Sequence, residues 1–106
     1  MNIGTAIRTV RKEQQISQGI LAEMIGLSQS SLSLIESGES IPSPKSLAAI
    51  CRVLRVSPAL LYMLGIEESD VPEERRAIYT ALGSTFKALA MQLLGPEQGE
   101  LLEKRM

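Results

Sequence analysis

The chain has 106 residues, of which 44% are hydrophobic and 22% charged, a size and composition that suit one small domain with a single core. Its formal net charge of −1 excludes the strong overall basic character of many nucleic-acid-binding proteins. With no His and one Cys, the sequence excludes a disulfide framework, zinc sites of the Cys and His kind and catalysis by a His base.

The start of the chain, Met1-Asn2-Ile3-Gly4-Thr5, has no basic region that leads into an apolar run. No apolar stretch approaches the roughly 18 residues that a membrane span needs. A lone Cys suits a reducing compartment, and Cys51 is most simply a small buried core residue. We therefore expect a cytoplasmic protein with no membrane partner.

The first helix is expected over roughly residues 2 to 14. Apolar residues recur at the spacing of one helical face, at Ile3, Ala6, Ile7 and Val10. The pattern ends in a polar run that follows Val10. This segment therefore predicts an amphipathic helix with one buried side.

Two short helices are expected next, joined by a tight turn. Ser17 and Ser28 stand at N-cap positions, and Gly26 and Gly38 stand where helices end. The inward residues of the two helices are Leu21, Ala22, Ile25, Leu32 and Ile35. Two short helices about a Gly-containing turn are the layout of a helix-turn-helix, whose second helix enters a DNA major groove.

Two further helices complete the first part of the chain. Pro44 suits the first turn of a fourth helix, and Ser57-Pro58 repeats the signal for a brief fifth helix that Gly65 ends. The fourth helix carries Leu47, Ala48, Ile50, Cys51 and Leu54, and the fifth carries Leu60, Leu61 and Leu64. Residues 1 to 65 therefore predict five helices and no strand.

The rest of the chain reads as a linker and a helical tail. The acidic run Glu67-Glu68-Ser69-Asp70 marks a linker over residues 66–72, and Pro72 is placed to open a long helix that Gly95-Pro96 stops. We divide the chain into a helix-turn-helix domain (1–65), a linker (66–72) and a helical tail (73–106). A last amphipathic piece over roughly residues 96 to 105 carries Leu101 and Leu102.

A family resemblance rests on many spaced positions. They are Ser17-Gln18, Leu21-Ala22, Ile25-Gly26-Leu27-Ser28, Ser30, Leu32-Ser33, Ile35-Glu36, Gly38 and Pro42, with Ser46-Leu47 and residues 54 to 61 further along. Over roughly residues 3 to 64 the chain resembles the Xre family of Cro and phage-repressor-like helix-turn-helix regulators. The resemblance implies an all-α, five-helix, lambda-repressor-like module and a sequence-specific DNA-binding repressor or activator, usually a dimer on a two-fold operator.

The second helix of the motif carries the candidate reading surface. At about 100° per residue, a helix that turns Leu32 and Ile35 inward presents another face to solvent. A Gln amide can bind adenine, Ser hydroxyls can bond base edges or phosphates, and Leu can contact thymine methyl groups. We expect base contacts from Gln29, Ser30, Ser33 and Leu34, and a phosphate contact from Ser37. The alternative is an ordinary solvated, Ser-rich face.

Further contacts are expected around this surface. The resemblance implies that Gln18 bonds a DNA phosphate and braces the glutamine of the reading helix, and that Arg11 and Glu36 form a structural ion pair. Arg8, Lys12 and Lys45 are candidate phosphate contacts, or else solvated charges. Where the family often has basic residues, this chain has Leu34 and Glu39, which removes phosphate or guanine contacts.

The tail carries an apolar stripe that predicts association. Its residues follow helical spacing over four turns, and neighbouring Ala residues permit close approach of another helix. The stripe consists of Ile78, Leu82, Phe86, Leu89 and Leu93. We expect a homodimer through this stripe; the alternatives are a tail that folds back on its own module or one that binds a partner protein.

We expect a transcription regulator that acts on double-stranded DNA without chemistry, cofactor or metal. No His is present to activate a Ser, and no Gly-rich phosphate loop appears. The alternative function is an antitoxin-type or other protein-interaction module whose C-terminal helices bind a partner. Residues 1–65 carry six basic and four acidic residues, a net +2, whereas the remainder carries five basic and eight acidic residues, a net −3.

Overall fold

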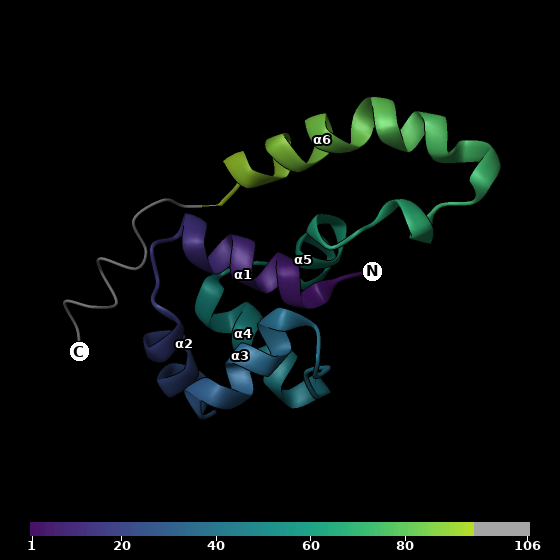
Figure 1. Ribbon diagram of the computed structural model, residues 1–106. Coiled ribbons are helices and arrows are strands. Elements are labelled where there is room, and N and C mark those ends of the chain that lie inside the picture. Colours follow the sequence, from purple (N-terminus) through teal and green to yellow (C-terminus); the bar gives the residue numbers. More distant parts are fainter. Residues whose placement is uncertain (95–106) are drawn as a thin grey trace.

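The computed structural model describes residues 1–94, whose regular secondary structure is all helical, with no strand (Figure 1). The elements are α1 (Ile3–Glu13), α2 (Gln18–Ile25), α3 (Gln29–Ser37), α4 (Pro44–Leu54), α5 (Pro58–Leu64), two short 3-10 turns (Glu68–Asp70 and Glu73–Arg75) and α6 (Arg76–Gln92). The predicted all-α class, with five helices followed by a helical extension, is confirmed. The final piece expected over residues 96 to 105, with Leu101 and Leu102, lies outside the described residues.

Local signals set the ends of the short helices. The hydroxyls of Ser17, Ser28, Ser43 and Ser57 each accept a hydrogen bond from the backbone N–H three residues on, at 3.1 Å in every case. Gly26 and Gly38 follow α2 and α3 with φ of 74° and 86°, in the left-handed region that favours glycine. The turn of the motif is therefore fixed by residues within it.

The core lies where α1, α2, α3, α4 and α5 meet. Its largest fully buried side chains are Ile7, Ile16, Leu21, Leu32, Ile50, Leu54 and Leu61. Along α4 the sequence analysis included Ala48 among the apolar residues, but Ala48 is exposed and Ala49 is buried instead. Ile50 sets the inner face of α4, and a residue two positions before it lies about 200° away around the helix.

Polar residues in the run after Val10 are also buried. Gln14 is 1% exposed, and its Nε2 donates to the carbonyl oxygen of Leu54 at 2.7 Å, which joins the end of α1 to the end of α4. Its Oε1 has no hydrogen-bond partner in the structure. The apolar spacing of the sequence ended at Val10, yet Gln14 lies four residues after Val10 and so shares its buried face.

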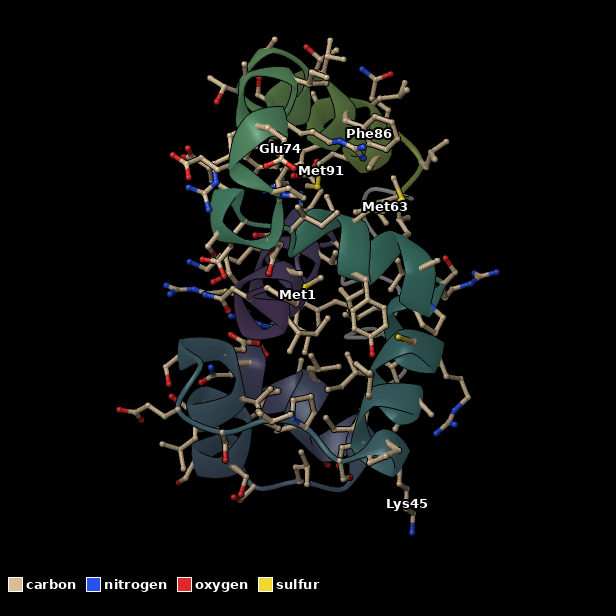
Figure 2. The ribbon with its side chains drawn as sticks, turned by 90° about the vertical axis from the view of Figure 1, so that its right-hand side faces the viewer. Met1, Lys45, Met63, Glu74, Phe86 and Met91 are labelled. Atoms are coloured by element: carbon tan, nitrogen blue, oxygen red, sulfur yellow. The ribbon has the colours of Figure 1, made fainter. Side chains whose placement is uncertain are left out.

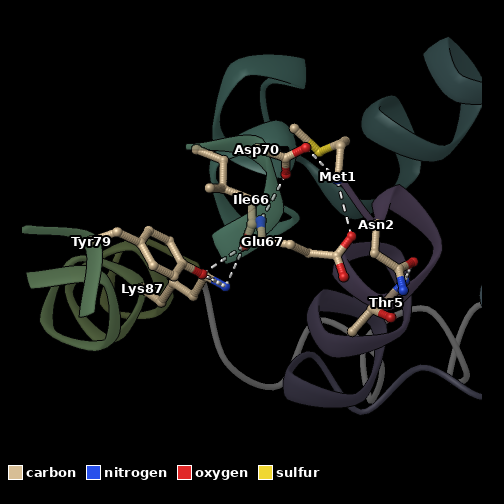
Figure 3. A network of polar contacts seen from close by, with 8 residues as sticks. All are labelled: Met1, Asn2, Thr5, Ile66, Glu67, Asp70, Tyr79 and Lys87. Atoms are coloured by element: carbon tan, nitrogen blue, oxygen red, sulfur yellow. Dashed lines mark hydrogen bonds and ion pairs between the residues drawn. The ribbon is translucent and has the colours of Figure 1, made fainter. Parts of the chain in front are cut away.

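Helix α6 folds back across the module, at the end of the molecule opposite α3 (Figure 1). Ala90 and Leu94 are buried in the common core, and Met91 packs against it (Figure 2). Tyr79 Oη and Lys87 Nζ both donate to the Ile66 carbonyl oxygen, at 3.0 and 2.8 Å (Figure 3). One face of α6 is therefore docked on its own chain.

The predicted stripe is on another face of the same helix and is exposed. The exposed fractions are 63% for Ile78, 58% for Leu82, 54% for Phe86, 58% for Leu89 and 73% for Leu93. The tail thus folds back through a face that the sequence analysis had not assigned. No residue among 1–94 covers the face that carries the predicted stripe.

The long helix begins later than Pro72, where the sequence placed its start. A 3-10 turn over Glu73–Arg75 intervenes, and regular α-helix begins at Arg76. The Nε of Arg76 donates to the carbonyl oxygen of Val71 at 3.1 Å. This bond joins the first residue of α6 to the connection before it. The chain changes direction between these two residues, and the 3-10 turn allows this because it is tighter than a turn of α-helix.

The acidic connection is tied to the start of α1. The Met1 ammonium lies 2.6 Å from Asp70 Oδ1 and 3.0 Å from Glu67 Oε1 (Figure 3). Hydrogen bonds to Asp70 and then to Glu67 raise the pKa of this ammonium, and the bond from the ammonium lowers the pKa of the Asp70 carboxyl. These contacts hold residues 66–72 against the module.

Three other findings bear on function classes. Among residues 1–94 no single helix is long and apolar enough to cross a membrane; α4 and α5 pass that test only as a pair, which is bent by 93°. The same part of the chain has no cluster of three or more potential metal ligands. Cys51 is buried, and desolvation raises the pKa of its thiol, which leaves it a packing residue.

Gly4 allows α1 to lie directly on the end of α3. A Cβ at this position would lie within van der Waals overlap of the Ile35 carbonyl oxygen, a backbone atom. We expect Gly4→Ala to lower the free energy of unfolding by about 1 to 3 kcal/mol or more, because the two helices must move apart. Urea unfolding followed by circular dichroism measures the loss.

The matched control is Gly19→Ala at the start of α2. A Cβ there would lie 3.4 Å from Gln29 Oε1, an ordinary contact, and Ala favours a helix over Gly by about 1 kcal/mol. We expect this variant to unfold at or above the denaturant midpoint of the unmodified chain. Equal midpoints for the two variants would contradict the proposed close approach of α1 and α3.

Candidate nucleic-acid interface

The two faces of α3 divide between core and solvent. Leu32, Ile35 and Glu36 are at most 5% exposed. The five residues of the candidate reading surface, Gln29, Ser30, Ser33, Leu34 and Ser37, are all exposed. Leu34 is 45% exposed, which is high for a large apolar side chain on a short helix. The helix thus presents a continuous face of small or medium side chains that no other described residue covers.

A buried ion pair holds α3 against α1. Arg11 Nε lies 2.7 Å from Glu36 Oε2, and Arg11 Nη2 lies 2.9 Å from Glu36 Oε1, a two-point contact between planar groups. Arg11 Nη1 also donates to the Ile16 carbonyl oxygen at 2.9 Å. One guanidinium therefore binds both α3 and the connection between α1 and α2.

Hydrogen bonds continue from this pair to the surface. Glu36 Oε1 accepts from Gln18 Nε2 at 3.2 Å, and Gln18 Oε1 accepts from Gln29 Nε2 at 3.4 Å. Gln18 is half-buried and Gln29 is exposed. The amide of Gln29 is thus held at the start of α3 by a chain of contacts that begins in the core.

Gly19 lies next to this arrangement. A Cβ at this position would stand 3.4 Å from Gln29 Oε1 and 3.8 Å from Gln29 Cδ, which is ordinary van der Waals contact. The start of α2 therefore lies against the Gln29 amide. The sequence analysis passed over Gly19, because its neighbour Gln29 is ten residues away and only the turn brings them together.

A polar hollow lies between α1 and α3. It has a volume of about 300 Å³ and is lined by Arg8, Arg11, Gln18, Ser33, Glu36 and Ser37. Three of the candidate phosphate contacts, Arg8, Gln18 and Ser37, therefore share one concave surface. The Ser37 hydroxyl also donates to the Leu34 carbonyl oxygen at 3.0 Å.

The remaining candidate cations lie apart from the hollow. Lys12 is exposed one turn after Arg8 on α1, and Lys45 is exposed at the start of α4. In Figure 2 Lys45 projects into solvent at the end of the molecule opposite α6. Contact with DNA by Lys45 would therefore extend the interface from α3 to the first turn of α4.

Comparisons with known proteins identify a helix-turn-helix region in the chain. A family model described as helix-turn-helix matches residues 7–61. Two uncharacterized HTH-type transcriptional regulators from Mycobacterium tuberculosis strains are each 38% identical over 79 residues, which cover 73% of this chain and 56% of the relative. The chain thus spans just over half the length of these relatives.

Two phage proteins are also similar. The ImmF control region 10 kDa protein of Bacillus phage phi105 is 35% identical over 72 residues, which cover 68% of this chain and 77% of the relative. Repressor protein C2 of Salmonella phage P22 is 31% identical over 74 residues, which cover 70% of this chain and 34% of the relative. No solved structure matches the chain.

The buried ion pair generates a stability prediction. Glu36→Gln removes the counter-charge of Arg11, whose side chain is 9% exposed, and leaves a buried cation without compensation. We expect the free energy of unfolding to fall by about 3 to 5 kcal/mol. Urea unfolding of this variant and of Glu39→Gln, which changes an exposed carboxylate nearby, measures the difference. Similar midpoints would show that the pair contributes little.

Proposed function

Since the chain belongs to the Xre family of helix-turn-helix transcriptional regulators, we propose that it represses transcription by binding a palindromic operator as a homodimer, with α3 in the major groove. The family comprises DNA-binding regulators rather than enzymes. The observation that carries the proposal is the exposed face of α3, whose first residue, Gln29, is held by Gln18. Operator DNA would be bound in the bacterial cytoplasm.

Base recognition falls to four side chains of α3. Gln29 offers an amide donor and acceptor together, the pattern that pairs with adenine in the major groove. Ser30 and Ser33 bond base edges at close approach, and Leu34 contacts thymine methyl groups. All four are exposed, and the helix backbone beneath them is held by the buried Glu36.

Phosphate contacts surround this face. A DNA backbone strand at the hollow between α1 and α3 meets Arg8, Gln18 and Ser37 together, and Lys12 and Lys45 extend the contact on either side. The backbone N–H groups at the start of α2 add a positive helix end next to Gln18. These groups fix the position of α3 without reading sequence.

The charge distribution fits this orientation. The net charge of +2 over residues 1–65 lies in the module that holds α3, whereas the rest of the chain is acidic. Helix α6 and the acidic connection lie at the end of the molecule away from α3 (Figure 1). A charge of +2 gives modest nonspecific affinity, so discrimination depends on base contacts.

The exposed stripe of α6 supplies the dimer contact. Monomeric proteins rarely expose a contiguous apolar patch larger than a few hundred Å², and five large side chains are more than half exposed along this helix. A dimer must hold its two copies of α3 about 34 Å apart to meet successive major grooves. Pairing through α6 joins two modules while both reading surfaces stay free.

The second candidate function uses the same stripe for another partner. In helix-in-groove binding, a helix places its apolar face in a hydrophobic groove of another protein. An antitoxin-type module would bind its partner protein through Ile78, Leu82, Phe86, Leu89 and Leu93. Such a protein would use this face for its partner protein and not for a second copy of the chain.

Selection from random DNA duplexes tests the operator proposal. We expect the full chain to select a palindromic site at moderate salt. Gln29→Ala should relax the preference at one base position by about 1 to 3 kcal/mol, whereas Lys45→Ala should weaken binding to all sequences alike. The absence of any selected sequence, or the same uniform loss for both variants, would contradict the assignment of Gln29.

Solution mass tests the dimer proposal. Truncation before α6 would also remove Ala90 and Leu94 from the core, so substitutions on the exposed face are the cleaner test. We expect Leu89→Glu to convert a dimer to a monomer by analytical ultracentrifugation, because it places a charge within the apolar seam. Ser84→Glu, on the exposed far side of α6, is the control and should remain dimeric. A monomeric unmodified chain would contradict the proposal.

A further inference from the structure

A groove runs along the side of α6, between the docked face and the exposed stripe. It has a volume of about 330 Å³, and its walls are apolar side chains of α6 on one side and Met63 and Ile66 on the other. The two polar groups beside it, Tyr79 Oη and Lys87 Nζ, both bind the Ile66 carbonyl oxygen. The groove therefore suits an apolar side chain.

The α6 wall of this groove has the geometry of a coiled-coil hole. Tyr79, Leu82, Gly83 and Phe86 stand at positions i, i+3, i+4 and i+7, the four residues between which a knob from a facing helix inserts. Gly83 leaves one corner of the hole open. A Cβ there would lie only 3.3 Å from the Tyr79 ring, so the bare backbone also gives that ring room beside the helix.

The same helix carries a matching knob. Leu82, Phe86, Leu89 and Leu93 follow the alternating spacing of four, three and four residues that forms a coiled-coil seam. Ser84 is the midpoint of α6 (Arg76–Gln92). In an antiparallel pair that crosses at Ser84, Phe86 of one copy lies at the level of Leu82 of the other, next to the hole. In a parallel pair, Phe86 faces Phe86 and the hole stays empty.

The position of the reading helix requires the same orientation. Helix α6 runs crosswise over the module, at the end opposite α3 (Figure 1). Parallel packing of two α6 helices puts the two-fold axis along them, which turns the two copies of α3 to opposite sides of the dimer. Antiparallel packing puts the axis across the helices, so both copies of α3 can face one duplex.

Charge places no obstacle between two copies. From Ala77 to Gln92, Lys87 is the one charged residue of α6, and its ammonium is bound to Ile66 on the docked side. The face around Leu82 and Phe86 is uncharged, so a second copy would meet no repulsion between like charges. A charged partner would find no group of opposite charge on this face. The polarity of this face is therefore compatible with that of a second copy.

We propose that two copies of this chain pair through antiparallel α6 helices, with Phe86 of each copy seated in the groove beside Gly83 of the other. This inference rests on the dimer in the proposed function and adds its orientation, its register and the residue pair at its centre.

Distances between spin labels test the orientation in the full-length chain. Single cysteines at Ser84 and Gln92, both exposed, carry the label in a Cys51→Ala background. Antiparallel pairing gives no axial offset between the two Ser84 labels and an offset of about 24 Å between the two Gln92 labels, at 1.5 Å per residue. We therefore expect a clearly longer distance for Gln92. Equal distances would mean parallel pairing and would overturn the inference, while the dimer itself would stand.

Filling the groove tests the register. We expect Gly83→Leu to weaken dimerisation at least tenfold, because the added side chain occupies the place of the partner's ring. Ala81→Leu, at an exposed position away from the stripe, is the matched control and should dimerise as the unmodified chain does. Adding Phe86→Ala to Gly83→Leu should recover part of the lost affinity, since it removes the displaced ring.

Two outcomes would overturn the proposal through this second test. Undiminished dimerisation of Gly83→Leu would show that the groove is not used. A monomeric chain at all concentrations, with residues 95–106 or another protein covering the face, would remove both the inference and the dimer of the proposed function. Selection of an operator by that monomer would still leave the DNA-binding part of the function intact.

Discussion

The Arg11–Glu36 ion pair is the interaction on which the rest of the motif depends. Helices of 8 and 9 residues, as α2 and α3 are, are too short to be stable by themselves. The guanidinium binds α3 through Glu36 and the start of the motif through the Ile16 carbonyl, while Gln18 completes the hydrogen bonds of the carboxylate. A single buried charge pair thereby sets the distance between α1, α2 and α3.

Most of the first 65 residues could be predicted from sequence because their helix ends depend on local chemistry. Ser17 bonds an amide three residues away, which a reader of the sequence can anticipate. Gln14 could not be assigned in this way, since its partner, the Leu54 carbonyl, is 40 residues distant. At the site, the exposed side of α3 followed from helical spacing, whereas the contact between Gly19 and Gln29 depends on the turn.

The tail was harder to predict because apolar residues of its helix can serve either packing on the module or association with another chain. The sequence analysis treated folding back and association as alternatives. In the structure Ala90 and Leu94 enter the core on one side of α6, while Phe86 and Leu89 remain exposed on another. Both sides carry apolar residues, so the sequence pattern did not show which side packs on the module. One amphipathic helix can therefore pack on its own core through one face and offer another face for contact with a partner.

The alternation of buried and exposed residues along α3 has an evolutionary consequence. Leu32, Ile35 and Glu36 carry the stability of the motif, whereas Ser30 and Ser33 face outward and contribute little to packing. Mutations at the outward positions can accumulate with little effect on folding. A lineage of such proteins can therefore acquire new binding preferences by small steps, each of which leaves a folded molecule for selection to act on.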